Sequence, residues 1–287
     1  MLNYFQAVVL GLLQGLTELF PISSLGHSVI LPKLLGWQIQ QGDNAFVIFL
    51  VATHLATALV LLGFFWRDWL RILAGLVRSL REREIRDSDP DAKLAWLLIV
   101  ATIPAGFIGL ALEQPLQNLF ASAQIAAFFL ILNGVLLLAA ERLSRRTRGE
   151  NPTIADSDTR IARLTWWQAI TVGAAQAIAL IPGFSRTGAS MTGSLGVGLS
   201  HEDAARYSFL LATPIIGAAA FLKLPELALS GETQIFGPLV AGALCAGVAA
   251  YLAVRFLTRY FKANTLTPFA IYCLAAGALS LVLLLLH

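Results

Sequence analysis

Two short stretches of an otherwise apolar chain hold residues able to do chemistry together. In the first, Gln14 and Glu18 are four residues apart, which puts both side chains on one face of a helix. Ser24 and His27, three residues apart, share a face of the helix that follows. A serine beside a histidine and near a carboxylate is the outline of a nucleophile with its base, which makes Glu18, Ser24 and His27 candidates for catalysis. The alternatives are a serine that only caps a helix and a histidine that only bridges two helices.

The second stretch, residues 182–190, reads Pro-Gly-Phe-Ser-Arg-Thr-Gly-Ala-Ser. A glycine-rich backbone at a helix N-terminus presents N–H groups that bind anions. An arginine adds a planar group that bonds two phosphate oxygens at once. We therefore expect an anion site here, with Arg186 as its charged group. The candidate binding residues of both stretches are Gln14, Ser23, Gly183, Ser185, Thr187 and Ser190.

The composition places both stretches in a membrane. Of the 287 residues, 57% are hydrophobic and 13% are charged, and the mean hydropathy is +0.73. An ordinary globular domain carries about 25% charged residues. So few charges do not cover a water-soluble protein of this size, which argues against a soluble enzyme, a disordered chain and a nucleic-acid-binding protein. The expected partner is the bilayer, and ionisable residues at membrane depth are functional candidates by default.

The apolar pattern predicts an all-α integral membrane protein with six transmembrane helices. The stretches long enough to span are approximately 44–66, 94–113, 122–142, 205–222, 235–255 and 267–286. Two more hydrophobic regions, about 4–36 and 166–200, are broken by proline, glycine, serine and charge into pieces too short to span. Because lipid does not satisfy the backbone of such breaks, we expect two re-entrant helix pairs that face a cavity.

The basic residues predict the orientation. Of the 20 Lys and Arg, seven lie in 67–93, six in 142–163 and three in 255–262, and the positive-inside rule makes all three segments cytoplasmic. The six spans then alternate without conflict, with 114–121, 223–234 and both termini outside. The whole chain, 1–287, is expected to form one membrane domain.

The two broken regions also resemble each other at an offset of about 162 residues. The matching positions are Gln6, Ala7, Gly11 and Gln14 in the first region and Gln168, Ala169, Gly173 and Gln176 in the second. Each region also has a serine three residues after a proline. We expect an inverted-topology repeat, about 1–142 and 164–287 joined by a cytoplasmic linker at about 143–163, with the site near the midplane where the broken helices meet.

The two stretches closely resemble the signatures of the undecaprenyl-diphosphatase (bacitracin-resistance) family. The first is similar to Glu/Gln-x-x-x-Glu…Pro-x-Ser-Ser-x-Gly-His, and the second to Pro-Gly-x-Ser-Arg-Ser-x-x-Thr. The resemblance implies a multi-pass phosphatase of the bacterial cytoplasmic (inner) membrane that converts a C55 isoprenyl diphosphate to the monophosphate and so recycles the lipid carrier for cell-wall polymers. It maps the family's required positions onto Glu18, Ser24, His27 and Arg186, and the family's phosphate loop onto Ser185, Thr187 and Ser190. A homodimer is a possible assembly.

Two mechanisms fit these residues. In one, Arg186 and Ser185 clamp the diphosphate while Ser24 attacks the terminal phosphorus. His27 is then the base or the activator of water, and Glu18 orients it or holds Mg²⁺ or Ca²⁺. In the other, water attacks directly and Ser24 only donates a hydrogen bond. Gln14 stands where many family members have Glu, and a neutral amide does not share a divalent cation as a second carboxylate would.

A flippase or transporter on the same inverted repeat is the alternative function. Its coupling ions would require carboxylates within both halves, and the second broken region has none. A third possibility is the other membrane lipid-phosphatase superfamily, which has Lys-x6-Arg-Pro and Ser-Arg-x5-His signatures. The sequence has no Lys-x6-Arg-Pro element and no histidine at the required spacing after Ser185-Arg186. His54 and Asn133, each inside a span, are expected to form hydrogen bonds between helices.

Overall fold

The computed structural model describes residues 2–39, 44–86, 88–111, 122–147, 156–229 and 236–286, and all regular elements within these ranges are helices. Five of the described helices are long and apolar enough to cross a membrane, so the chain is a multi-pass membrane protein. They are α3 (Asn44–Phe64), α5 (Pro90–Ala111), α7 (Ala123–Thr147), α12 (Phe236–Tyr260) and α13 (Thr267–Leu286).

These five helices coincide with five of the six predicted spans. The sixth predicted span, 205–222, lies within α11 (His201–Leu229). That helix continues to Leu229, into the segment 223–234 that is predicted to lie outside. The predicted loop at 114–121 and the middle of the predicted linker, residues 148–155, lie outside the described residues.

The first broken region forms two helices, α1 (Tyr4–Leu19) and α2 (Ser24–Leu34). The break falls where the sequence predicts it, because the residue before Pro21 is pushed out of the α region. Ser23 starts α2 as its N-cap, with its hydroxyl accepting the Gly26 N–H at 3.1 Å. The predicted capping serine and the predicted second half-helix are both present.

The second broken region forms α9 (Trp166–Ala177), a short 3₁₀ turn η1 (Ile178–Leu180) and α10 (Arg186–Gly196). Ser185 caps α10 and accepts the Gly188 N–H at 3.1 Å. The preceding break needs a glycine, since Gly183 has a φ of +104° and a Cβ there would lie 2.4 Å from the carbonyl oxygen of Ala126 on α7. Gly183 therefore allows the break to press against α7.

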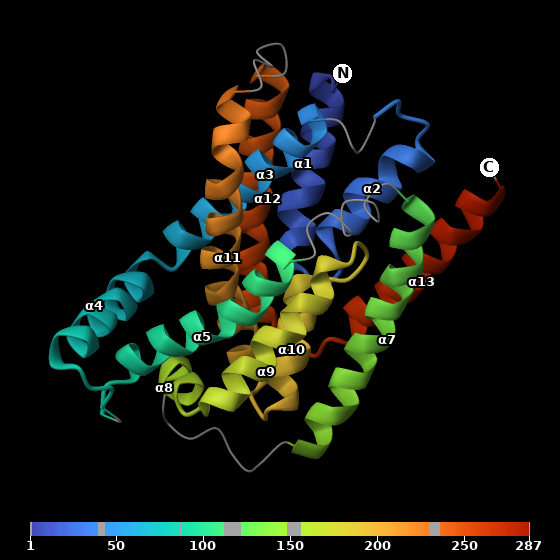
Figure 1. Ribbon diagram of the computed structural model, residues 1–287. Coiled ribbons are helices and arrows are strands. Elements are labelled where there is room, and N and C mark those ends of the chain that lie inside the picture. The colour runs from blue at the N-terminus through green and yellow to red at the C-terminus, as the bar shows by residue number, and fades with distance from the viewer. Residues whose placement is uncertain are drawn as a thin grey trace.

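The broken helices pack along membrane-spanning helices through glycines. At Gly11 of α1 a Cβ would lie 2.2 Å from the carbonyl oxygen of Gly242 on α12. At Gly173 of α9 it would lie 2.2 Å from the carbonyl oxygen of Ala101 on α5. Figure 1 shows α1 starting near the upper edge of the molecule and α9 near its lower edge. The two pairs thus approach each other from opposite ends, and their breaks meet in the interior.

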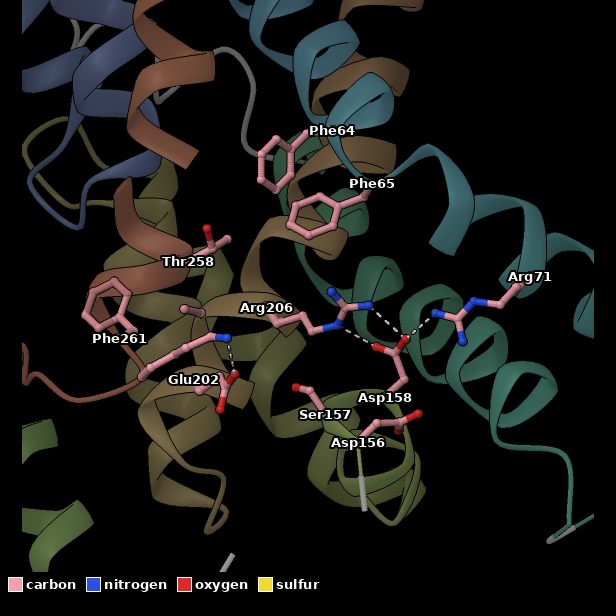
Figure 2. A pocket seen from close by; sticks show the side chains of 12 residues that line it. Phe64, Phe65, Arg71, Asp156, Ser157, Asp158, Glu202, Arg206, Thr258 and Phe261 are labelled. Atoms are coloured by element: carbon pink, nitrogen blue, oxygen red, sulfur yellow. Dashed lines mark hydrogen bonds and ion pairs between the residues drawn. The ribbon is translucent and has the colours of Figure 1, made fainter. Parts of the chain in front are cut away.

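Ion pairs join the basic segments at one end of the molecule. Asp158 on α8 (Ser157–Ala162) accepts from Arg206 of α11, with Nε 2.6 Å from Oδ1, and from Arg71 of α4 (Trp66–Glu82), with Nη2 2.9 Å from Oδ2 (Figure 2). Lys262, beyond α12, lines the same pocket as these residues and lies 3.8 Å from Glu202. The three segments predicted to share one side of the membrane therefore lie together.

Candidate active site

The site is centred on the carboxylate of Glu18, buried in the last turn of α1. The hydroxyl of Ser24, the first residue of α2, donates to Oε2. The guanidinium of Arg186, the first residue of α10, donates through Nη2 to Oε1. The two helix breaks therefore converge on one carboxylate, as the sequence predicts for Glu18, Ser24 and Arg186.

One amide on α7 ties the two breaks together. Asn133 donates through Nδ2 to the carbonyl of Pro21 at 2.9 Å, and its Oδ1 accepts the backbone N–H of Ser185 at 3.1 Å. The Ser185 hydroxyl also donates to the carbonyl of Phe20 at 3.3 Å. The expected hydrogen bonding of Asn133 between helices is confirmed, and this residue holds the two halves of the site next to each other.

The other hydroxyls of the second stretch also make internal contacts. Thr187 donates to the backbone carbonyl of Glu18 at 3.0 Å, which holds α10 against α1. Ser190 lies 2.7 Å from the hydroxyl of Ser208 on α11. These bonds give the hydroxyls a positioning role in the site, and the phosphate binding expected of them stays a prediction.

His27 faces away from the carboxylate. Its Nδ1 is 2.6 Å from the carbonyl oxygen of Ser23, which only accepts, so Nδ1 carries the hydrogen. Its Nε2 is then free to accept from the hydroxyl of Tyr272 on α13, 2.8 Å away. Sharing a helix with Ser24 did not bring His27 to Glu18, because at this position the ring turns toward α13.

The histidine that does meet the acid is His54, in the middle of α3. Its Nε2 lies 3.1 Å from Oε2 of Glu18, the oxygen that also accepts from Ser24. The helix-to-helix hydrogen bond expected of His54 is therefore present, with the acid of the site as its partner. An ionisable residue at membrane depth was the available signal, and it applies to His54 as it does to Glu18.

The residues around Glu18 do not fit a resident Mg²⁺ or Ca²⁺ ion. Such ions take six or more oxygen ligands. Here both carboxylate oxygens face donors, one of them a guanidinium. Gln14 turns its Nε2 toward Oε2 at 3.5 Å, while its Oε1 accepts from Thr57 at 3.2 Å. Within the described residues no group of three or more His, Cys, Asp or Glu could hold a metal.

The arrangement joins a proton acceptor, a hydroxyl and a fixed positive charge in a buried site. A carboxylate within hydrogen-bond reach of a hydroxyl can take its proton, and a guanidinium can hold the negative charge of an oxyanion. Arg186 also donates through Nη1 to the carbonyl of Ala212 at 3.3 Å, which orients it from α11. This set of groups suits attack on a phosphorus or an acyl carbon.

Comparison with known proteins identifies the family. The family model of bacitracin resistance protein BacA matches residues 7–279. The chain is 51% identical to an undecaprenyl-diphosphatase of Mycolicibacterium paratuberculosis, over 100% of this chain and 99% of that one. It is 46% identical to an undecaprenyl-diphosphatase of Acidiphilium cryptum, over 97% of each chain, and 45% identical to undecaprenyl-diphosphatase 2 of Frankia alni, over 98% of each. With its two signature stretches meeting at one carboxylate, the chain belongs to the bacitracin resistance protein BacA family.

Proposed function

We propose that this protein is a membrane phosphatase that hydrolyses undecaprenyl diphosphate to undecaprenyl phosphate and inorganic phosphate. Its family and the names of its full-length relatives support the reaction and the substrate. The observation that carries the proposal is that Glu18 accepts from both Ser24 and Arg186. A nucleophile, its proton acceptor and a phosphate-binding cation thereby stand at one point.

Ser24 is the nucleophile in this proposal. Its hydroxyl proton passes to Glu18 as Oγ bonds to the terminal phosphorus. The P–O bond to the isoprenyl monophosphate breaks, and the leaving oxygen takes the electron pair. Water then attacks the phosphoserine and the Oγ–P bond breaks. The proton held by Glu18 returns to Oγ, and inorganic phosphate leaves with the proton of the water. No step passes through a metal ion, because the donor set around Glu18 does not fit one.

Arg186 recognises the diphosphate and stabilises charge on the transferred phosphoryl group. Its Nη2 is bonded to Glu18, so the arriving anion competes with this carboxylate for the guanidinium. Binding of the substrate therefore releases Oε1 of Glu18 from the guanidinium. The carboxylate becomes available as a proton acceptor at the moment when the phosphorus arrives.

Direct attack by water, with Ser24 only donating a hydrogen bond, is the rival route. The test measures phosphate release from undecaprenyl diphosphate by purified protein in detergent, with Ser24→Ala, Glu18→Ala and Arg186→Ala beside the parent protein. We expect all three variants to lose nearly all activity and a stalled variant to yield phosphoserine at position 24. Full turnover by Ser24→Ala would leave the direct route in its place.

His27 keeps a proposed role on the Tyr272 side of α2, where it could activate the second water. Its bonds to Ser23 and Tyr272 leave Glu18 as the group that contacts the Ser24 hydroxyl. The flippase alternative has no observation in its favour, because the second broken region contributes Arg186 to the site and no carboxylate.

We further infer that the chain is an inverted repeat with two re-entrant pairs in the cytoplasmic membrane and both termini outside. The opposite starting points of α1 and α9, the equivalent caps Ser23 and Ser185, and the meeting of the basic segments at one end support this topology. Single cysteines introduced at Asn3 and at Arg78 test it. The first is expected to react with a membrane-impermeant reagent added outside intact cells, and the second only after permeabilisation.

A further inference from the structure

The histidine at Glu18 is held by its own helix. The Nδ1 of His54 is 2.7 Å from the carbonyl oxygen of Leu50, one turn earlier on α3. Because a carbonyl oxygen only accepts, Nδ1 carries a hydrogen and Nε2 is the nitrogen left for Glu18. The tautomer and the orientation of the ring are therefore set before any substrate binds.

The contact between Nε2 of His54 and Oε2 of Glu18 contains one shared proton. With hydrogen on Nδ1, a neutral ring would aim the lone pair of Nε2 at the lone pairs of an ionised carboxylate, and the two would repel each other. The 3.1 Å separation thus corresponds to imidazolium with carboxylate or to imidazole with carboxylic acid. Ser24 and Arg186 both donate to this carboxylate, which favours the first arrangement.

The two oxygens of Glu18 have different partners. Oε1 accepts from Arg186, whereas Oε2 accepts from Ser24 and meets His54. The last torsion of a glutamate side chain is soft, so nothing in the side chain itself determines which oxygen faces the serine. A donor on Oε2 that comes from a third helix supplies that constraint.

We propose that His54 is a positioning residue whose imidazole N–H holds Oε2 of Glu18 against the Ser24 hydroxyl. It does so while the guanidinium of Arg186 moves from Oε1 to the arriving diphosphate. This inference rests on the proposed function. Once the substrate has taken the guanidinium, His54 is the remaining cationic partner of Glu18. It keeps the carboxylate oriented through the step in which the carboxylate accepts the serine proton.

The chain offers a matched control at a second His–Glu pair. The Nε2 of His201, at the start of α11, lies 2.8 Å from Oε2 of Glu141 on α7, and both side chains are buried. The same oxygen accepts the backbone N–H of Leu266 at 3.2 Å. This pair has similar chemistry, with the histidine more deeply buried than His54, but it belongs to the packing of α7, α11 and the start of α13.

The experiment compares kcat and KM of the parent protein, His54→Ala, His54→Gln and His201→Gln with undecaprenyl diphosphate in detergent. We expect His54→Ala to lower kcat about tenfold to hundredfold, the size expected for loss of a hydrogen bond to a charged group, with KM within about threefold. His54→Gln should recover part of the lost kcat, because its amide N–H can reach Oε2. His201→Gln should lower the thermal midpoint and leave kcat and KM of the folded protein near the parent values.

Three results would overturn the inference: kcat of both His54 variants within about twofold of the parent, equal kcat for His54→Ala and His54→Gln, or a raised KM with unchanged kcat. If His54→Ala does not purify folded, His54→Asn takes its place, since its shorter amide falls short of Glu18 and should be less active than His54→Gln. Equal activity of that pair would count against the inference too. A parent protein that releases no phosphate would instead refute the proposed function.

Discussion

Two regions of the molecule place a buried carboxylate between two cationic partners, with different consequences. Glu18 meets Arg186 and His54 in the interior, and Asp158 meets Arg71 and Arg206 where the basic segments come together. At Asp158 the hydrogen bonds found within the described residues come from guanidinium groups. At Glu18 a serine hydroxyl donates as well. The serine hydroxyl, and not the ion pair, therefore distinguishes the proposed active site from the Asp158 cluster.

The surroundings of the two carboxylates also differ, in their exposure to water and in the elements that hold their partners. The Asp158 cluster borders a cavity of about 360 Å³ lined by Phe65, Ser157 and Lys262 among others (Figure 2). Arg71 is about half exposed there, so water and salt screen its pairing with Asp158. Asp158 therefore acts as a clamp that joins α4, α8 and α11. Ser24 and Arg186, in contrast, contact Glu18 from the ends of broken helices, where exchange of one partner for a substrate is possible.

Among changes at the two carboxylates, Glu18→Gln is expected to lower the activity most. The amide keeps the size of the side chain and loses the ability to take the Ser24 proton, so kcat should fall about 10²- to 10⁴-fold. Phosphate release by purified protein measures it, with Asp158→Asn as the matched change at the other carboxylate. Comparable losses of kcat in both folded variants would erase the distinction between the two regions.

Arg186→Lys is expected to have the next largest effect. The charge stays but the planar pair of N–H groups is lost, so we expect kcat/KM to fall about tenfold to hundredfold, less than with Arg186→Ala. Steady-state kinetics on all three proteins gives the order. Arg206→Lys, at the Asp158 cluster, is the control and should leave kcat/KM unchanged. A lysine variant as inactive as the alanine variant would show that geometry, and not charge, accounts for the whole contribution.

Asp158→Asn should destabilise the protein and spare its chemistry. Removing the charge takes one shared carboxylate from Arg71 and Arg206, which keep Asp68 as a common partner. This second partner and partial exposure reduce the loss to about 1–2 kcal/mol. The thermal midpoint in detergent measures this loss, together with kcat on the folded fraction. An unchanged midpoint would mean that the cluster does not act as a clamp.

The smallest effect concerns Asp156, which lies beside the clamp and caps α8. Its carboxylate accepts the Thr159 N–H at 2.7 Å, and this bond lowers the pKa of Asp156 below its usual value. A lowered folded-state pKa gives stability that is present above the unfolded-state pKa and is lost as the pH falls through the folded-state pKa. Asp156→Ala should therefore cost about 1 kcal/mol at neutral pH and progressively less below about pH 4. Thermal midpoints of both proteins across this range check the trend, and a difference that is constant with pH would contradict it.

Much of the fold follows from local signals in the sequence. The length of the apolar stretches predicts five of the helices, Pro21 ends α1, and Ser23 and Ser185 begin α2 and α10 as caps. The meeting of Glu18, Ser24 and Arg186 was also expected, because intramembrane charges in two broken regions need a common polar environment. These signals come from interactions between neighbouring residues or from the preference of side chains for the bilayer as a solvent. Both kinds of signal are visible in the local sequence.

Only the tertiary structure decided which side chains complete the site. His27 is close to Ser24 in sequence and turns to Tyr272, whereas His54 reaches Glu18 from a separate helix. Asn133 connects two breaks that are distant in sequence. The physical reason is that a helical period tells which residues share a face, while the partner of that face is chosen by packing against helices far away in the chain.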